Sequence, residues 1–275
     1  MKIGLLHPGD MGASIGHSLR LSGNEVYWAS EGRSLRTCDR ADRAGLTDLI
    51  SLNDLSKEAE MLVSVCPPLA SEAIAAQILD SQFEGIYLEA NAISPQKSER
   101  ISDLYTNAPI NYVDGGIVGA PAWHSGSTRL YLSGEQADAV AKVFAGGTLE
   151  ARVISDRIGP ASAMKMCFAA YTKGTTSLVA EILATAQHFG VTDSLINEWG
   201  DETTDARIAN IQRIASRAWR WEDEMHEIGD TLEQAGIPEG AYRAAAELYA
   251  RMAEFKDVED KPNWENLLKA LLEKT

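Results

Sequence analysis

The chain has few cysteines and lacks any long apolar run. Its cysteines, Cys38, Cys66 and Cys167, are far apart in the 275 residues and form no C-x-x-C pair. An odd number of scattered cysteines cannot supply a disulfide framework, so the pattern excludes a disulfide-stabilised secreted domain and favours a reducing compartment. A membrane-spanning helix needs about 18 or more consecutive apolar residues, and no such segment is present. The N-terminal apolar stretch is too short for a signal peptide, and we expect a soluble, cytoplasmic protein.

Basic residues are also scarce. Lysine and arginine number 25 against 40 aspartates and glutamates, which gives a formal net charge of −15 at pH 7. Proteins that bind nucleic acid usually present a basic face, so the composition argues against a nucleic-acid partner. The histidines, cysteines and carboxylates show no spacing typical of a metal site. We therefore expect the partner to be a small-molecule substrate.

Strands and helices alternate over the first 157 residues. Short apolar runs predict strands at 2–7, 25–29, 61–66, 86–90, 110–113, 129–132 and 152–154. Helical spacing is found at 11–21 and 71–79, and a third helix begins at Pro95 with Ser94 as its N-cap. This alternation predicts βαβ units and an α/β fold with a Rossmann-like, doubly wound, mostly parallel sheet.

The pattern changes at residue 158, after which no strand is predicted. Apolar residues recur every three or four positions from 160 to 189, which predicts one long helix that ends at Gly190. Such a helix is about 45 Å long, and we expect its apolar sides to be covered by other helices or by a second subunit. Further helices are predicted at 205–219, 225–235, 239–255 and 263–273. We thus expect a dinucleotide-binding domain, 1–157, an all-helical substrate and dimerisation domain, 158–275, and a homodimer.

The segment IGLLHPGDMG, residues 3–12, is close to the dinucleotide fingerprint G-x-G-x-x-G. Gly9 and Gly12 stand where the second glycine lets the backbone approach the pyrophosphate and the third lets helix and strand pack closely. The free N–H groups and the dipole at the start of the following helix favour an anion. His7 replaces the first glycine, which only eases the turn. His7 is either a hydrogen-bond donor to a phosphate or a structural residue. The second role is the more frequent one for a lone histidine in a turn.

The end of the second strand, VYWASEGRS, bears on the choice between the nicotinamide cofactors. An acidic residue there holds the ribose 2′-hydroxyl of NAD, whereas a nearby arginine accommodates the 2′-phosphate of NADP. Ser30, Arg33 and Ser34 are suited to a phosphate, and Arg33 can bind it bidentately. Glu31 instead suits NAD. We predict NADP and keep NAD as the alternative, in which Arg33 is a solvated residue at a helix start.

Four segments together carry a family resemblance. They are IGLLHPGDMG (3–12), LEANAISP (88–95), VDGGIVGAPAWHSGSTRLYLSG (113–134) and IGPASAMKMCFAAYTKG (158–174). With them the chain resembles the β-hydroxyacid dehydrogenase superfamily, which includes 6-phosphogluconate and 3-hydroxyisobutyrate dehydrogenases. It is more similar to the branch of that superfamily with a DUF1932-type helical C-terminal domain. The resemblance covers nearly the whole chain, although the C-terminal part matches only in helical character and in its first helix.

The resemblance implies roles for particular residues. It implies cofactor contacts from three motifs: His7, Gly9, Asp10, Met11, Gly12, Cys66, Pro67, Pro68 and Asn91. It implies substrate contacts from the segment that begins at Asp114: Val118, Gly119 and Ala120. Lys165 matches the catalytic lysine, and Asn91 is the polar group near the nicotinamide. Val118 replaces the substrate-binding serine of the family, and Phe168 and Ala169 replace its two amide residues, so we expect a bulkier or less polar substrate.

A lysine as acid and base also follows from the chemistry. Oxidation of an alcohol by hydride transfer needs a group that takes the hydroxyl proton, and the reverse reaction needs a proton donor. The ammonium group of lysine has a pKa of about 10.4 in water, which burial among apolar residues lowers. Lys165 lies between Met164 and Met166 in a predicted apolar helix, so it is expected to bind substrate and exchange the proton. The alternative is a lysine that extends to solvent from the helix flank.

These inferences lead to one expected function and two alternatives. We expect an NADP-dependent oxidoreductase that transfers hydride between the nicotinamide and a small carbonyl compound or β-hydroxy acid-like alcohol, with the substrate between the domains. The first alternative is reduction of a C=N bond, as in the related imine reductases, which commonly carry aspartate or tyrosine in place of the lysine. The second is a catalytically idle NADP-binding sensor. His124 is either a substrate contact or a surface residue. Tyr171 is expected to be a core residue, and Lys173 a structural residue or a second positive group. Four residues of the helical domain are expected at an interface with a partner subunit, with binding of an anionic or aromatic substrate as the alternative: Arg217, Trp219, Arg220 and Trp221.

Overall fold

The computed structural model describes residues 1–256, 258 and 260–273, which form two compact units. Unit 1 is Met1–Met166, and unit 2 begins at Cys167. The sequence predicts the boundary after Arg157, whereas the division into compact units falls after Met166. The difference arises because the helix that begins at Pro160 is tied at its first turn to the sheet of unit 1 by Asp114, as described below.

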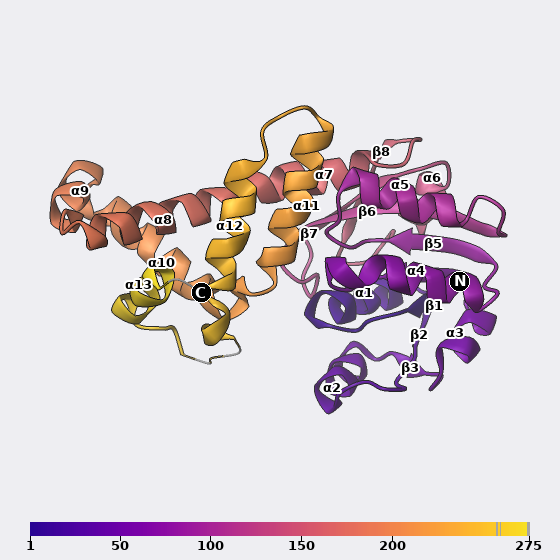
Figure 1. Ribbon diagram of the computed structural model, residues 1–275. Coiled ribbons are helices and arrows are strands. Elements are labelled where there is room, and N and C mark those ends of the chain that lie inside the picture. Colours follow the sequence, from indigo (N-terminus) through magenta and orange to yellow (C-terminus); the bar gives the residue numbers. More distant parts are fainter. Residues whose placement is uncertain (257, 259, 274–275) are drawn as a thin grey trace. The chain divides into compact units, whose positions relative to one another are not determined.

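Unit 1 is built on a sheet with the strand order β3-β2-β1-β4-β5-β6-β7-β8 (Figure 1). The strands are β1 (Lys2–Leu5), β2 (Glu25–Trp28), β3 (Thr47–Asp48), β4 (Met61–Ser64), β5 (Gly85–Glu89), β6 (Ile110–Gly119), β7 (Thr128–Ser133) and β8 (Glu150–Ser155). Neighbouring strands are parallel except for β6 and β7, which are antiparallel. The predicted Rossmann-like, mostly parallel sheet is therefore confirmed.

Helices cover both faces of this sheet. The helices of unit 1 are α1 (Asp10–Leu21), α2 (Leu35–Ala44), α3 (Leu52–Glu58), the short 3-10 helix η1 (Pro68–Ala70), α4 (Ser71–Asp80), α5 (Pro95–Leu104) and α6 (Ala137–Val143). Residues of α1, α2 and α6 share one core cluster with Met61 and Val63 of β4, and residues of α3, α4 and α5 share a second cluster with Leu62. Successive side chains of a strand point to opposite faces, so β4 serves both cores.

Unit 2 is helical throughout its described part. After α7 (Pro160–Ala169) come the π-helical segment η2 (Ala170–Gly174), α8 (Thr175–His188), α9 (Thr192–Trp199), α10 (Asp201–Ala218), α11 (Trp221–Gln234), α12 (Gly240–Ala250), the 3-10 helix η3 (Ala253–Phe255) and α13 (Trp264–Leu272). The run from α7 to α8 matches the predicted helix 160–189, except for the π-helical segment. Gly190 ends it as predicted, with φ of 67° and a hydrogen bond from the Val191 amide to the Ala186 carbonyl. Within the described residues, no helix has the length and apolar character that crossing a bilayer requires.

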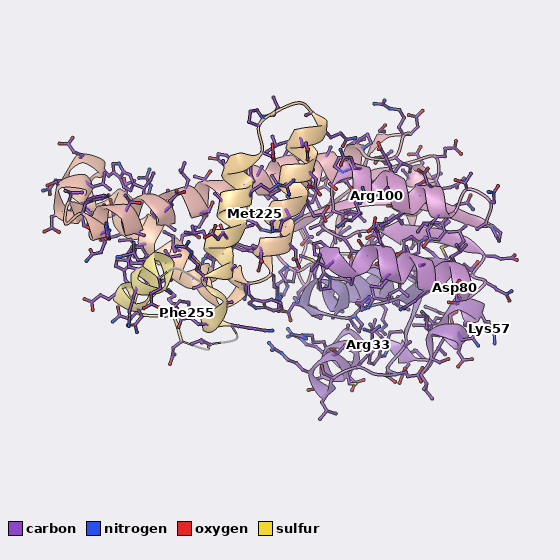
Figure 2. The ribbon with its side chains drawn as sticks, viewed as in Figure 1. Arg33, Lys57, Asp80, Arg100, Met225 and Phe255 are labelled. Atoms are coloured by element: carbon purple, nitrogen blue, oxygen red, sulfur yellow. The ribbon has the colours of Figure 1, made fainter. Side chains whose placement is uncertain are left out.

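The core of unit 2 leaves one side of the long helix exposed. Met225 of α11, labelled in Figure 2, is fully buried, as is Tyr249 of α12. The side of α8 with Ala180 and Leu183 is also buried. Phe168, Tyr171, Leu178 and Phe189 are 39, 75, 54 and 72% exposed. The expectation that Tyr171 is a core residue is therefore wrong for this chain, because Tyr171 shares the exposed side of the helix with Phe168 and Leu178.

Candidate functional site

The strand order places a ligand-binding position at the carboxyl ends of β1 and β4. The chain leaves β1 for β2 on one side, whereas β4 lies on the other side of β1. In open α/β sheets, ligands bind outside the carboxyl ends of the strands where the order reverses in this way. The turn that joins β1 to α1 and the segment that follows β4 border this position, and both contain residues predicted to bind the cofactor.

The turn between β1 and α1 is shaped by its two glycines. A Cβ on Gly12 would lie 2.0 Å from the carbonyl oxygen of His7, so a residue with a side chain cannot hold α1 this close to the turn. A Cβ on Gly9 would meet no atom within 4 Å, so the space beside Gly9 is open. Gly9 is also the N-cap of α1 and supplies no side-chain hydrogen bond to the helix. The backbone N–H groups at the start of the helix, at Asp10 and Met11, are thus suited to an anion.

The carboxylate of Asp10 stands in the first turn of α1, where a second anion would be repelled. Its Oδ1 lies 2.7 Å from Nε of Arg40 on α2. This ion pair offsets the negative charge beside the helix N-terminus. A phosphate group bound there therefore meets a carboxylate whose charge is balanced by Arg40. Asp10 is expected to bind the phosphate through its backbone amide.

A cavity of about 170 Å³ lies at the ends of β1 and β2. His7 and Arg33 line it together with Glu31 and with apolar residues of α3 and α4. Nη2 of Arg33, which is labelled in Figure 2, donates a hydrogen bond to the Leu6 carbonyl oxygen at 3.3 Å. Burial and the nearby Arg33 lower the pKa of His7 to about 4, so the imidazole is neutral at pH 7. Arg33 is then the cation in this lining.

The two serines predicted beside Arg33 are not in the cavity lining. Oγ of Ser34 caps α2 by accepting a hydrogen bond from the Thr37 amide at 3.3 Å. The backbone amide of Ser30 donates to Asp48 Oδ1 at 3.1 Å. The cavity therefore offers one group for each cofactor: the guanidinium of Arg33 for a 2′-phosphate, and the carboxylate of Glu31 for ribose hydroxyls.

Asn91 joins the ends of β4 and β5. Its Oδ1 accepts a short hydrogen bond from the Cys66 amide, and its Nδ2 donates to Ser64 Oγ at 3.0 Å. The side chain is 2% exposed. These bonds fix the backbone that leads from Cys66 into Pro67 and Pro68, so Asn91 shapes the segment predicted to contact the cofactor. Burial raises the pKa of the Cys66 thiol to about 12, which keeps it neutral.

Glu89, the last residue of β5, is fully buried and was assigned no role from the sequence. Its Oε1 accepts a hydrogen bond from the Asn91 amide at 3.0 Å, and its Oε2 accepts a long one from the Tyr87 hydroxyl at 3.4 Å. Burial, with a smaller effect of Asp114, raises the pKa of Glu89 to about 8. The carboxyl group is therefore mostly protonated at pH 7.

Asp114 of β6 anchors the start of α7. Its Oδ2 accepts hydrogen bonds from the amides of Gly159 at 3.1 Å and Ser162 at 3.0 Å, and from Ser133 Oγ at 2.8 Å. Its Oδ1 accepts from Ser162 Oγ at 2.6 Å and Ser98 Oγ at 3.0 Å. A carboxylate that receives the first N–H groups of a helix caps it. The resemblance marks Asp114 only as the start of the substrate segment, and its role as a cap depends on residues far away in the sequence.

This anchor holds Lys165 next to β6. A Cβ on Gly116 would lie 2.9 Å from Lys165 Cβ and 2.4 Å from the Ala161 carbonyl oxygen, so glycine at this position allows α7 to approach the strand. Asp114 of β6 pairs with Glu89, the last residue of β5, and Gly116 lies two residues further along β6. Lys165 is therefore near the same edge of the sheet as the turn after β1. Its side chain is half-buried.

The predicted substrate segment continues along β6. Val118 is buried and pairs with Arg129 of β7, so its side chain is not presented at the surface. Gly119 and Ala120 are exposed, and Gly119 has a φ of 119° that a residue with a side chain rarely adopts. His124 is exposed in the following loop, where its carbonyl oxygen accepts a hydrogen bond from Ser127 Oγ at 2.9 Å.

Comparison with known sequences identifies the C-terminal part. Residues 186–252 match the model of the domain of unknown function DUF1932. An uncharacterized 28.5 kDa protein of Methanothermus fervidus is 24% identical over 211 residues, which cover 77% of this chain and 80% of that protein.

Solved structures share the fold over nearly the whole chain. The conserved protein MTH1747 of unknown function, described as structurally similar to 3-hydroxyacid dehydrogenases, is 25% identical, with a TM-score of 0.68 over 93% of this chain and 98% of its own. The 3-hydroxyisobutyrate dehydrogenase of Salmonella typhimurium is 16% identical, with a TM-score of 0.72 over 98% of this chain and 99% of its own. The imine reductase of Streptomyces aurantiacus is 16% identical, with a TM-score of 0.55 over 100% of both chains. The match to the DUF1932 model and the fold shared with MTH1747 and the 3-hydroxyisobutyrate dehydrogenase agree with the resemblance to the β-hydroxyacid dehydrogenase superfamily, and to its branch with a DUF1932-type C-terminal domain.

Proposed function

We propose that the protein is an oxidoreductase that uses NADP to transfer hydride between the nicotinamide and a small carbonyl compound or β-hydroxy acid-like alcohol. The observation that carries the proposal is the position of Lys165 beside Gly116 of β6, past the end of β5. The turn around Gly9 and Gly12 lies at the carboxyl end of β1 in the same parallel part of the sheet. A dinucleotide bound along this edge would approach the lysine from within unit 1.

Lys165 is the proposed proton carrier. When bound, the cofactor accepts or supplies the hydride. In the oxidising direction the hydroxyl proton of the alcohol passes to the neutral amine of Lys165 as the carbon loses hydride. In the reducing direction the ammonium returns that proton to the oxygen as hydride arrives. Asp114 and Gly116 are positioning residues in this account, because they fix the helix that carries Lys165.

The cavity at the ends of β1 and β2 is the proposed site of the adenosine end of the cofactor. NADP is favoured because Arg33 can bind a 2′-phosphate bidentately, and because Arg33 is the cation in the described lining. Glu31 in the same lining supports NAD as the competing choice. The ratio of kcat/KM for NADPH to that for NADH tests this point, and we expect a ratio above one.

Two other functions fit particular observations. Reduction of a C=N bond is supported by the fold shared with imine reductases. A cofactor-binding sensor without catalysis is supported by Val118, which is buried where the related dehydrogenases have a substrate-binding serine. Turnover of cyclic imines but not of carbonyl compounds would favour the first, and NADPH binding with no turnover of either would favour the second.

The decisive experiment compares Lys165→Ala with wild type. We expect NADPH oxidation with a panel of small carbonyl compounds to fall at least about 100-fold in kcat, while NADPH affinity, measured by nicotinamide fluorescence, is unchanged. Lys142→Ala removes an exposed lysine on α6 and serves as the control that retains activity. Equal activity of the two variants would contradict the proposed role of Lys165.

We also propose a homodimer that covers the exposed side of the long helix. Thr175, Leu178, Ile182 and Phe189, along α8 and at its end, follow one another at intervals of three, four and seven residues. This is the a/d pattern by which helices pack against one another. The same stripe on a second copy is self-complementary about a twofold axis.

A further inference from the structure

Unit 2 contains a cavity of about 530 Å³ that the proposed hydride transfer does not use, and one of its lining residues, Thr175, also belongs to the stripe of the proposed dimer. It is bordered by the π-helical segment with Tyr171 and Lys173, by α10 and by Trp221 at the start of α11. Its volume falls within the usual range of small-molecule sites, about 300–1,000 Å³. A π-helical segment inside a longer helix is uncommon and often marks a functional site.

Positive charge dominates the lining of this cavity. Arg207, Arg213 and Lys173 border it, and no aspartate or glutamate is among the described lining residues. Lys173 is paired with Glu224, so the net positive charge comes from the two arginines of α10. This is unusual for a chain with a net charge of −15. An adjoining open hollow shares Arg207 and Asn210 with the cavity, and its lining adds the carboxylate of Glu202.

Polar contacts hold the arginine side of the cavity in place. Nη2 of Arg213 donates to Asn210 Oδ1 at 2.6 Å, and Nδ2 of Asn210 donates to Thr176 Oγ1 at 3.3 Å. The guanidinium of Arg207 lies over the ring of Trp199, 4.7 Å from its centroid. Arg207, Asn210 and Arg213 stand three residues apart, which places them along one side of α10. Side chains ordered before binding lose less entropy when a ligand arrives.

The remaining wall of the cavity is apolar. Val179 of α8 and Ile214 of α10 contribute aliphatic surface, and Trp221 contributes an aromatic ring. That ring meets Tyr249 edge-on, with centroids 5.3 Å apart, and the Lys173 ammonium lies 4.9 Å from its centroid. A ligand that fills this space must present an apolar body to one side and negative charge to the other.

We propose that this cavity binds a small organic anion, a carboxylate attached to an apolar or aromatic body. The carboxylate accepts hydrogen bonds from Arg207 and Arg213, and the body packs against Val179, Ile214 and Trp221. Carboxylates suit this site because arginine recognises their two oxygens with paired N–H groups. The binding needs no nicotinamide cofactor, so its outcome is independent of the proposed hydride transfer.

Calorimetric titration of the full chain without cofactor tests the proposal. The probes are 3-phenylpropionate, an aromatic carboxylate, and 3-phenylpropanol, its neutral counterpart. We expect saturable binding of the carboxylate and at least about tenfold weaker binding of the alcohol, because the alcohol lacks the charge-assisted hydrogen bonds. Arg207→Gln and Arg213→Gln should each weaken carboxylate binding about tenfold. Because Trp221 lines the cavity, ligand-induced fluorescence quenching should be present in wild type and smaller in Trp221→Phe.

The matched control is Arg217→Gln, which removes an exposed arginine from the same helix outside the cavity lining. It should bind the carboxylate as wild type does, and circular dichroism should show unchanged helix content in all three arginine variants. Equal affinity for acid and alcohol would overturn the proposal. So would a loss of binding in Arg217→Gln as large as in Arg213→Gln, or no saturable binding of the carboxylate at millimolar concentration.

Discussion

At the scale of single residues, the candidate site depends on glycines, which have no side chain, and on polar side chains that are buried. Gly12 is required because a Cβ would meet the His7 carbonyl oxygen, and Gly116 because a Cβ would meet α7. The side-chain oxygen of Asn91 accepts a hydrogen bond from the Cys66 amide, and the backbone amide of Asn91 donates one to the buried carboxyl group of Glu89. The site is therefore shaped by backbone position, and the proposed proton transfer depends on Lys165.

Glu89 makes the stability of unit 1 depend on pH. The carboxyl group has an ordinary pKa of 4.5 when the chain is unfolded and a pKa of about 8 when it is folded. Between these values the folded state binds the proton more strongly, so the free energy of unfolding falls as pH rises from 4.5 to 8. Glu89→Gln, a neutral replacement of the same shape, removes this effect.

Relative to wild type, we expect the free energy of unfolding of Glu89→Gln to increase by roughly 3–4 kcal/mol between pH 5 and pH 8. Urea unfolding at the two pH values measures this difference. Glu84→Gln, at an exposed position just before β5, is the control and should show no such gain. A difference between Glu89→Gln and wild type that does not change with pH would show that the group is ionised in the folded protein.

At the scale of elements, a network of buried hydrogen bonds to Asp114 holds the start of α7. Asp114 accepts hydrogen bonds from three serine side chains and two backbone amides, all buried. Removal of a buried charged acceptor leaves its donors unsatisfied, so we expect Asp114→Ala to lower the free energy of unfolding by at least about 3 kcal/mol. Ser162→Ala removes one side-chain donor and should cost about 1 kcal/mol.

Chemical unfolding of the two variants measures both values. Asp80→Ala removes an exposed carboxylate at the end of α4 and should change stability by less than about 0.5 kcal/mol. If Asp114→Ala were no more destabilising than Asp80→Ala, Asp114 would not be the anchor of α7, and the placement of Lys165 would need another explanation.

Elements with strong local signals were predicted from the sequence, and those defined by distant contacts were not. Strands such as β1 and β4 are short apolar runs in the sequence and lie where they were predicted. Ser94 caps α5 and Gly190 ends the long helix, also as predicted. By contrast, α2 has only two buried residues, Ala41 and Ala44, in a largely polar sequence, so apolar spacing gives little sign of it. The π-helical segment was missed because its residues fit the same spacing as an α-helix.

In the candidate site, too, features with a local sequence signal could be predicted and those that depend on distant contacts could not. The glycine turn and Lys165 are visible as motifs. The role of Asp114 is not visible, because its donors Ser98, Ser133 and Ser162 are 16, 19 and 48 residues away in the sequence. The different surroundings of Arg33 and Ser34 are not visible in the sequence either: Arg33 lines the cavity, whereas Ser34 caps α2.

At the scale of the whole molecule, the exposed stripe on the long helix predicts a second copy. We expect light scattering after size-exclusion chromatography to give a mass of about twice the 29.8 kDa of the chain. Leu178→Glu places a charge in the stripe and should shift the protein toward monomer. Glu181→Gln, on the same helix, should remain dimeric. A monomeric wild type would refute the proposed dimer without affecting the proposed site in unit 1.

The most direct measurement is a crystal structure of the protein with NADP bound. We expect the pyrophosphate at Gly9–Gly12, the 2′-phosphate on Arg33, and the nicotinamide ring close enough to Lys165 Nζ for one small molecule to touch both. A nicotinamide ring that lies out of reach of Lys165 in the presence of substrate would contradict the account.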